Sequence, residues 1–183
     1  MDICEKSKCT ACYACFNACK KNAITFKEGK YGALYPFIDI EKCVNCNACR
    51  KVCPNNNERT FNIPLKCYAA YTTDDNNRRM SASGGIGNGF AEFCIDKGGF
   101  FYGAVYKDDF EVVFKETQNF DELENFKGSK YVHSHINDTF AEIKQRLIEE
   151  KKVVFIALPC QIAGLNSFLK RNYDNLITVD FIC

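Results

Sequence analysis

The pattern of apolar and polar residues divides the chain into two parts. Up to about residue 57, apolar stretches are short and lie between cysteine-rich loops, and two of them, AITFKE at 23–28 and ALYPFIDI at 33–40, predict strands. Gly29 and Gly32 predict the turn that joins them. Beyond residue 65, longer apolar runs alternate with segments of helical period. The pattern therefore predicts a small, loop-rich unit followed by a larger unit with a regular core.

In the larger part, period-2 and continuous apolar runs predict strands, and apolar residues spaced three and four apart predict helices. The expected strands cover 67–73, 100–106, 110–117, 152–158 and 175–182. The expected helices cover 86–98, 137–152 and 159–173, with a short helical turn at 120–126. Asn137 is a candidate helix cap, and Pro159 suits a first helical turn. Because strand, helix and strand follow one another over 152–182, we expect the sheet to be partly parallel.

A polar stretch at 55–64, NNNERTFNIP, has the composition of a linker. The expected organisation is therefore a first domain at 1–57, a linker at 58–65 and an α/β domain at 66–183. Taken together, the predicted class is α+β.

Charge and hydropathy narrow the function classes. The chain has 183 residues and a formal net charge of +1, so it offers no basic face for nucleic acid. Its longest apolar run, at 153–165, is too short to cross a bilayer, and Pro159 interrupts it. We expect a soluble, cytoplasmic protein without a membrane partner. That compartment is reducing, so the thirteen cysteines are not expected to form disulfides.

Eight of the cysteines form two runs with the same spacing, C-x2-C-x2-C-x3-C. The first run holds Cys9, Cys12, Cys15 and Cys19, and the second holds Cys43, Cys46, Cys49 and Cys53. Zinc sites usually take their four ligands as two separated pairs, whereas three cysteines at every third position wrap a loop around a 4Fe-4S cluster. The runs therefore predict two 4Fe-4S clusters, and a zinc-binding interaction module remains the weakest reading.

In two-cluster ferredoxins the fourth cysteine of each run binds the other cluster. We therefore expect Cys53 to complete the first cluster and Cys19 to complete the second. Residues 1–57 resemble the dicluster ferredoxin family, including its internal repeat. Lys20 stands where a proline is usual, and Asn45 and Asn47 stand where glycine is common, but no ligand is lost because asparagine tolerates left-handed backbone.

A glycine-rich stretch, SASGGIG at 81–87, lies between a predicted strand and a predicted helix. Backbone N–H groups at such a helix start suit an anion or a phosphate. The stretch lacks the GK[ST] ending of a P-loop and the spacing of a dinucleotide-binding fingerprint. A tight structural turn with Ser81 or Ser83 as a helix cap is an equal alternative.

Several motifs of the larger part resemble, in order and spacing, the coenzyme F-420 hydrogenase/dehydrogenase beta subunit family. They are SASGGIG at 81–87, KGGFFYGAVYKDDFEVVF at 97–114, FKGSKYV at 126–132, LPCQIAGL at 158–165 and VDFIC at 179–183. The resemblance implies iron-sulfur clusters joined to a flavin, usually FAD, and electron transfer to a deazaflavin or another acceptor. It implies that the flavin site is lined by Ser81, Ser83, Gly84 and Gly85, with Gly128, Ser129, Lys130 and Tyr131 as further candidates. Lys130 would offset phosphate charge.

The chain also departs from this family. Leu158 replaces a common threonine, and Val132 and His133 follow the GSKY motif where glutamine is common. Members of the family continue beyond the strand that matches VDFIC, so we expect the α/β domain to be incomplete at its C-terminus. His133 and His135 are expected to be structural or surface groups.

Five cysteines lie outside the runs. Cys67 and Cys94 fall in apolar patterns and are expected to pack as small hydrophobic residues, and Cys4 has no assigned role. Cys160 opens a helix and Cys183 ends the next strand, at the sheet edge where α/β proteins bind ligands. These two are candidates to flank the flavin or to bind a further cluster, with simple packing as the alternative.

Together these features predict an iron-sulfur, flavin-dependent oxidoreductase or electron-transfer subunit. Its partners would be a redox protein or subunit and a small-molecule electron donor or acceptor. No catalytic side chain is identified, because cofactors carry such chemistry. The alternative is a non-enzymatic ferredoxin-type electron carrier whose second domain docks a partner.

Overall fold

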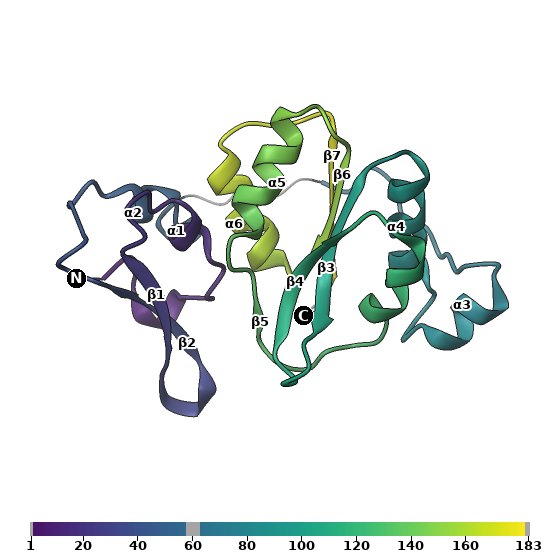
Figure 1. The fold of residues 1–183 in the computed structure, drawn as a ribbon, viewed down its shortest axis with the longest axis horizontal. Helices are drawn as coiled ribbons and strands as arrows, with labels where there is room; N and C mark the ends of the chain where they lie inside the picture. The colour runs from purple at the N-terminus through teal and green to yellow at the C-terminus, as the bar shows by residue number, and fades with distance from the viewer. Residues whose placement is uncertain (1, 58–62, 182–183) are drawn as a thin grey trace.

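The computed structural model describes residues 2–57 and 63–181, which we call the N-terminal and C-terminal units (Figure 1). Both units contain helices and strands, so the fold is α+β, as the pattern predicts. Residues 58–62, the greater part of the expected linker, lie outside the described residues. The domain boundaries therefore stay a prediction.

The N-terminal unit is built from short elements around the cysteine runs. In chain order they are η1 (Lys6–Lys8), α1 (Ala14–Asn17), β1 (Ile24–Glu28), η2 (Lys30–Gly32), β2 (Leu34–Ile38), α2 (Ala48–Val52) and η3 (Pro54–Asn56). Strands β1 and β2 pair antiparallel, with Ile24 opposite Ile38 and Glu28 opposite Leu34. This hairpin confirms the two predicted strands, and its Ile24–Ile38 end is buried against the cysteines.

The C-terminal unit contains a sheet with helices on both sides. Its elements are α3 (Asp75–Met80), α4 (Ile86–Asp96), β3 (Phe100–Tyr106), β4 (Val112–Thr117), η4 (Phe120–Phe126), β5 (Ser134–His135), α5 (Thr139–Ile148), β6 (Val153–Ala157), α6 (Pro159–Leu169) and β7 (Leu176–Asp180). Within the described residues the strand order is β5-β4-β3-β6-β7. Only β3 and β4 pair antiparallel, and β6-α6-β7 forms the predicted parallel unit.

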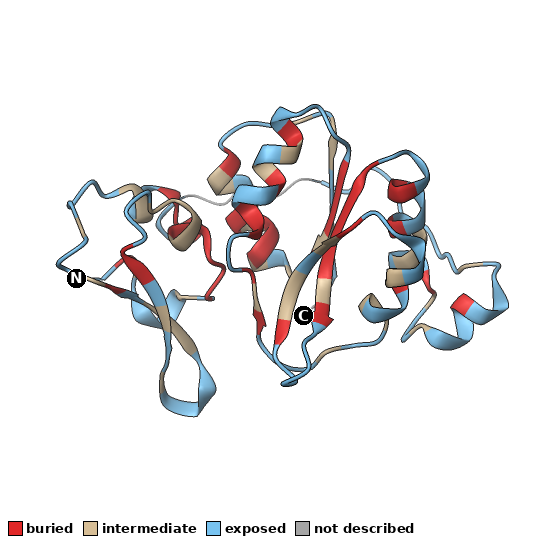
Figure 2. Cartoon of the chain, viewed as in Figure 1, coloured by how far each residue is buried: buried red, intermediate tan, exposed pale blue. Residues whose placement is uncertain are grey.

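Successive side chains of the central strands point to opposite faces of the sheet, which gives the unit its layers. Tyr102 and Phe155 belong to the core that α5 and α6 cover. Phe101 and Val154 instead pack with residues of α4 and η4. Figure 2 shows the central strands largely in the colour of buried residues, together with parts of the helices that cover them.

The core beneath α5 and α6 continues into the N-terminal unit. Cys12, Tyr13 and Val52 are buried in the same cluster as Phe140 and Leu165. The two units therefore share apolar core and meet along α1, α2, α5 and α6.

A second link between the units is polar. The Asn17 amide of α1 donates to the carbonyl of Asn137 (2.8 Å), and its side-chain oxygen accepts from the N–H of Ala141 (3.1 Å). Asn17 thus caps α5 from the other unit. The prediction that Asn137 caps this helix was wrong: Asn137 has a left-handed backbone (φ 47°), and the helix starts at Thr139.

The predicted strand at 67–73 was also wrong. These residues are almost all exposed and have no ladder partner within the described parts of the chain, although the N–H of Thr72 donates to the carbonyl of Gly84 (2.7 Å). An apolar alternation forms a strand only where a sheet edge is available to pair with it. Helix α3 follows instead, capped by the Asp74 carboxylate, which accepts from the N–H of Asn77 (2.6 Å).

Helix α4 packs on the sheet through only some of its apolar residues. Cys94 is buried as expected, but Phe90 and Phe93 are exposed, and the helix buries Ala91 and Ile95 with Cys94.

Candidate functional site

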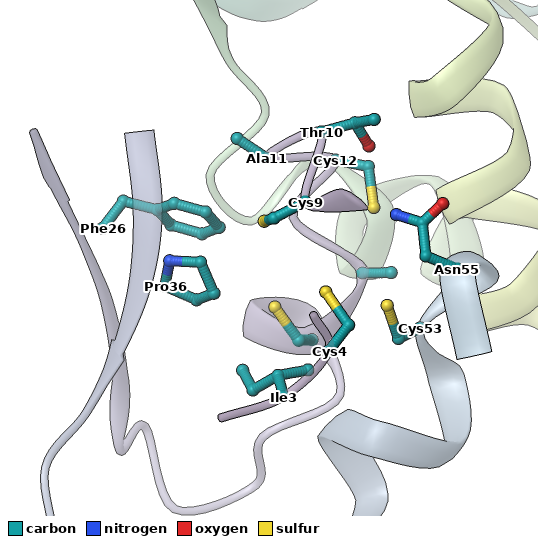
Figure 3. Close-up of a pocket in the computed structure, with 12 residues that line it drawn as sticks. Ile3, Cys4, Cys9, Thr10, Ala11, Cys12, Phe26, Pro36, Cys53 and Asn55 are labelled. Atoms are coloured by element: carbon teal, nitrogen blue, oxygen red, sulfur yellow. The ribbon is translucent and has the colours of Figure 1, made fainter. Parts of the chain in front are cut away.

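The first cysteine run folds around a pocket in the N-terminal unit (Figure 3). The pocket has a volume of about 300 Å³, including its open mouth. Its thiols belong to Cys4, Cys9, Cys12, Cys15 and Cys53. Cys53 comes from the second run, so the structure brings together the four cysteines expected at the first cluster. It also adds Cys4, to which the sequence assigned no role.

Left-handed backbone positions let both runs wrap tightly. In the first run Ala11 (φ 49°) and Tyr13 (φ 63°) adopt this conformation, and in the second run Asn45 (φ 53°) and Asn47 (φ 58°) do so at the corresponding places. Positive φ is costly for residues other than glycine and is tolerated best by asparagine. Because this left-handed conformation recurs at equivalent positions, both loops have the same tightly curved backbone.

The thiols of the pocket are poorly solvated. Burial is the main cause that raises the pKa of Cys12 to about 11, and it also raises the pKa of Cys15 well above its usual range. Burial, together with Cys53 and Cys9, raises the pKa of Cys4 to about 12. Such thiols become thiolates only when a positive charge compensates them, and bound iron provides that charge.

The second run gathers a second set of thiols. Cys19, Cys43 and Cys49 pack against one apolar core, and Cys19 and Cys43 lie close enough to Cys49 to raise its pKa, although burial contributes more. The N–H of Ala23 donates to the Cys19 sulfur (3.4 Å). Cys46 is exposed at the tip of the loop.

The first thiol pocket has the form that a cluster requires. A cubane places its irons at separate corners, so its cysteines surround a space instead of a point. A pocket lined by four or more thiols and by Ile3, Phe26 and Pro36 has that form.

The first cluster pocket adjoins the C-terminal unit at the start of α6. Cys160 lies close enough to Cys12 to contribute to the raised pKa of that thiol. One turn further along, the place of a Cβ on Gly164 is only 3.1 Å from the Cys12 sulfur. Cys160 thus lies beside the first thiol pocket, and its predicted place next to a flavin or a further cluster stays a prediction, while Cys183 lies outside the described residues.

Polar side chains complete this junction. The Tyr13 hydroxyl is hydrogen-bonded to Nδ1 of His135 (2.7 Å). The buried Gln161 amide donates to the hydroxyl of Ser134 (3.0 Å), and its side-chain oxygen accepts from the N–H of Leu158 (3.0 Å). His135 is therefore part of the interface, as a structural group, and the start of α6 is fixed to β5.

The glycine-rich turn, residues 81–87, lies at the same sheet edge. The place of a Cβ on Gly87 is 3.8 Å from the Ile156 side chain near the carboxyl end of β6, and α6 starts two residues after that strand ends. The N-termini of α4 and α6 therefore flank one strand end from opposite faces of the sheet (Figure 1). Ligands commonly bind at this edge in α/β sheets.

Within this turn the predicted residues have distinct roles. Gly85 (φ 76°) is the N-cap residue of α4 and offers no side-chain cap. The expectation that Ser81 or Ser83 caps α4 was wrong, because Ser81 donates to the carbonyl of Asn77 (2.7 Å) at the end of α3, and the Ser83 carbonyl accepts from Arg78. Gly84 lies against the chain at Ala70, leaving no room for a side chain there.

The sequence reading missed two groups beside this turn. Asn77 is 4% exposed, and its amide nitrogen has no hydrogen-bond partner among the described residues. Arg78 and Arg79 lie in the last turn of the same short helix. The run DDNNRRM carried a signal for this helix, because Asp74 is a good N-cap residue, but the false strand before it concealed that start.

The second predicted group of flavin contacts lies in the loop after η4. Gly128 (φ 78°) and Ser129 are exposed, and Lys130 is half-buried. The Lys130 ammonium donates to three carbonyls of its own loop, those of Phe126, Lys127 and Gly128, at 3.0–3.2 Å. It also lies 5.5 Å from the ring centroid of Tyr106, at the end of β3. Burial lowers the pKa of Lys130.

Comparison with known proteins agrees with the thiol geometry. Residues 8–57 match the family described as "4Fe-4S dicluster domain". Over 54 residues the chain is 33% identical to an uncharacterized ferredoxin of Methanocaldococcus jannaschii, covering 30% of this chain and 69% of that protein. Among the described residues, no helix is long and apolar enough to cross a membrane. Through its N-terminal unit, which is an iron-sulfur electron-carrier domain, the chain belongs to the dicluster 4Fe-4S ferredoxins.

Proposed function

We propose that this protein is an iron-sulfur flavoprotein oxidoreductase, or an electron-transfer subunit of one. It relays electrons between its two 4Fe-4S clusters and a flavin, and then to a deazaflavin or another acceptor. In this proposal Cys53 joins the first three cysteines of run one, and Cys19 joins those of run two. Residues 1–57 form the cluster domain and residues 66–183 the flavin-binding part.

The observation that carries the proposal is the position of α6 between the cluster pocket and the sheet edge. Its first turn places Cys160 beside Cys12, a proposed ligand of the first cluster. The same turn lies at the carboxyl end of β6, which α4 borders from the other face. A ligand bound at that sheet edge would lie next to the first cluster, with the packed start of α6 between them.

Each cofactor would supply chemistry that side chains cannot. Clusters accept and release single electrons, and a flavin exchanges a hydride or an electron pair for single electrons. The residues of this chain hold those groups, exclude water through the shared core and adjust their potentials by burial and by N–H groups such as that of Ala23.

The uncapped start of α4 supports binding of flavin phosphates. An eleven-residue helix leaves its first N–H groups free for an anion when no side chain caps it. Arg78 and Arg79 add positive charge, and the unpartnered amide of Asn77 is a buried donor beside the turn. FAD carries two phosphates, so these donors match its charged part.

The first test measures cofactor content. The protein is purified without oxygen, and iron, sulfide and released flavin are quantified per chain. About eight irons and one FAD are expected. Iron below about four per chain would overturn the cluster assignment, and iron without flavin, even after incubation with FAD, would overturn the flavin assignment.

Asn77→Asp tests the flavin site directly. It keeps the oxygen that faces Ser81 but replaces the unpartnered donor with a negative charge. We expect FAD affinity to fall at least tenfold, measured by fluorescence titration, with unchanged iron content. Asn166→Asp, the same change on an exposed face of α6, is the control and should bind FAD normally.

A second candidate function is a ferredoxin-type carrier without flavin. The tight contacts of Gly84 with Ala70 and of Gly85 with Thr72 favour it, because they make the glycine-rich turn a packing motif within the chain. This candidate predicts about eight irons, no flavin, and equal behaviour of Asn77→Asp and Asn166→Asp.

A further inference from the structure

The first cluster pocket contains more thiols than a 4Fe-4S cluster requires. Cys4 lines the same pocket as Cys9, Cys12, Cys15 and Cys53 (Figure 3). Its thiol lies within hydrogen-bonding reach of both Cys53 and Cys9. A cluster uses four cysteines, so one of these five sulfurs is in excess.

The segment that carries Cys4 is fixed by side chains of the second run and its flank. The amide of Asn56 donates to the carbonyl of Ile3 (2.9 Å), and Nε of Arg50 donates to the carbonyl of Asp2 (3.0 Å). Ile3 itself is only 6% exposed. The position of Cys4 is therefore built by the same α2–η3 region that presents Cys53.

The internal repeat shows that this arrangement is specific to the first site. Cys4 precedes the first run by five residues, and the residue five before the second run is Ile38, which is buried and apolar. The thiols close to Cys49 are those of Cys19 and Cys43, its expected partners. The first site thus has the additional thiol of Cys4 at the position where the second site has the hydrocarbon side chain of Ile38.

We propose that Cys4 is a reserve ligand of the first cluster, which takes over the iron corner of Cys53 when that bond is broken. In the exchange an iron–sulfur bond to Cys4 forms and the bond to Cys53 breaks. The proton of the Cys4 thiol passes to the departing Cys53 thiolate, its hydrogen-bond neighbour. No electron is gained or lost, so the step needs no oxidant or reductant.

This proposal predicts opposite results for two matched substitutions, Cys53→Ala and Cys19→Ala, each of which removes the fourth cysteine of a run. In protein purified without oxygen, C53A should keep about eight irons per chain, and C19A should fall markedly below that value. The double variant C4A/C53A should lose the first cluster, while C4A alone should keep both. Native mass spectrometry and the electron paramagnetic resonance of the reduced protein distinguish these states.

Alkylation gives a second readout that does not depend on iron content. Prolonged iodoacetamide treatment at alkaline pH, chosen because the pKa of Cys4 is raised, should label Cys4 in the native holoprotein and leave it protected in C53A, since iron-bound sulfur does not react. C53A/C67A, which removes a distant exposed thiol, controls for the number of cysteines and should match C53A. If the alanine variants are insoluble, the same comparison is made with Cys53→Ser in place of Cys53→Ala, with and without the change at Cys4.

Equal Cys4 labelling in C53A and in the native holoprotein, or equal iron loss in C53A and C4A/C53A, would overturn the reserve role. The inference rests on the ligand assignment of the proposed function, but the two fail differently. Native protein without four-iron clusters refutes both, whereas native protein with about eight irons and a C53A variant that behaves like C4A/C53A refutes only the role of Cys4.

Discussion

At the scale of single residues, the carboxylate of Glu116 links β4 to β3 and α5 in the C-terminal unit. Arg146 of α5 donates to both of its oxygens, each at 3.0 Å, and the hydroxyl of buried Tyr102 donates to one of them. The guanidinium also lies 4.2 Å from the ring centroid of Phe100. A planar, bidentate group is required for all of these contacts.

Arg146→Lys is therefore expected to destabilise the protein although the charge is kept. Lysine loses one of the two hydrogen bonds and the ring contact, which should cost about 1 kcal/mol of unfolding free energy. Thermal unfolding of the holoprotein measures this loss. Arg79→Lys, at an exposed position of α3, should be neutral, and an equal effect of both changes would contradict the argument.

At the scale of elements, α6 lies against the cluster loop because it has a glycine at the contact. A Cβ on Gly164 would lie 3.1 Å from both the carbonyl oxygen and the sulfur of Cys12. The loop cannot retreat, because Tyr13 and Ala14 beside it are buried in the shared core. Helix and loop therefore fit only without a side chain at this position.

Gly164→Ala should thus force α6 away from the first cluster. Overpacking of this kind costs about 1–3 kcal/mol, and we expect a lower thermal midpoint together with faster loss of the first cluster in air. Gly89→Ala is the matched control, since no atom of the described residues, apart from its chain neighbours and its own helix backbone, lies within 4 Å of its Cβ position, and alanine favours helix by up to about 1 kcal/mol. A stable Gly164→Ala variant would contradict the close fit.

Elements with a strong periodic pattern were predictable, and those that depend on distant partners were not. Strands β3, β4, β6 and β7 and helix α6 follow from local pattern, and the β6-α6-β7 unit follows from their order. The ferredoxin thiols were predictable because their spacing encodes the loop. The strand predicted at 67–73 does not form. A strand needs another strand to pair with, and a local sequence pattern does not show whether one is available.

The same reason explains what was missed at the sites. The cap of α5 comes from Asn17, more than a hundred residues away, so the local candidate Asn137 was favoured instead. Cys4 lies outside the spacing of the runs, and only the fold of the second run brings it to Cys53. The glycine-rich turn was placed correctly at a helix start, but the roles of its serines depend on α3, which was not expected.

At the scale of the whole molecule, the two units share one continuous core. Cys12, Tyr13 and Val52 are buried together with α5, α6 and the central strands. The N-terminal unit has little apolar core of its own and depends on bound clusters for its folding energy. Stability of the C-terminal unit is therefore coupled to the occupancy of the thiol sites.

Removal of iron should destabilise the entire chain. With a chelator under anaerobic, reducing conditions, we expect the thermal midpoint of the far-ultraviolet circular dichroism signal to fall by roughly 10 °C, in a chain of this size. Most of that signal comes from the C-terminal unit, which contains no cluster thiols of the two runs. An unchanged midpoint would show that the cores are energetically separate.

The cap that Asn17 provides for α5 has a consequence for modularity. Because one side chain completes the first turn of a helix in the other unit, neither unit can be exchanged for a homologous one without regard to this position. A hybrid that joins this C-terminal unit to another ferredoxin would lose the side-chain contact with the start of α5 unless the graft carries an asparagine there. The two units are in this respect a matched pair, and recombination between relatives is restricted at their border.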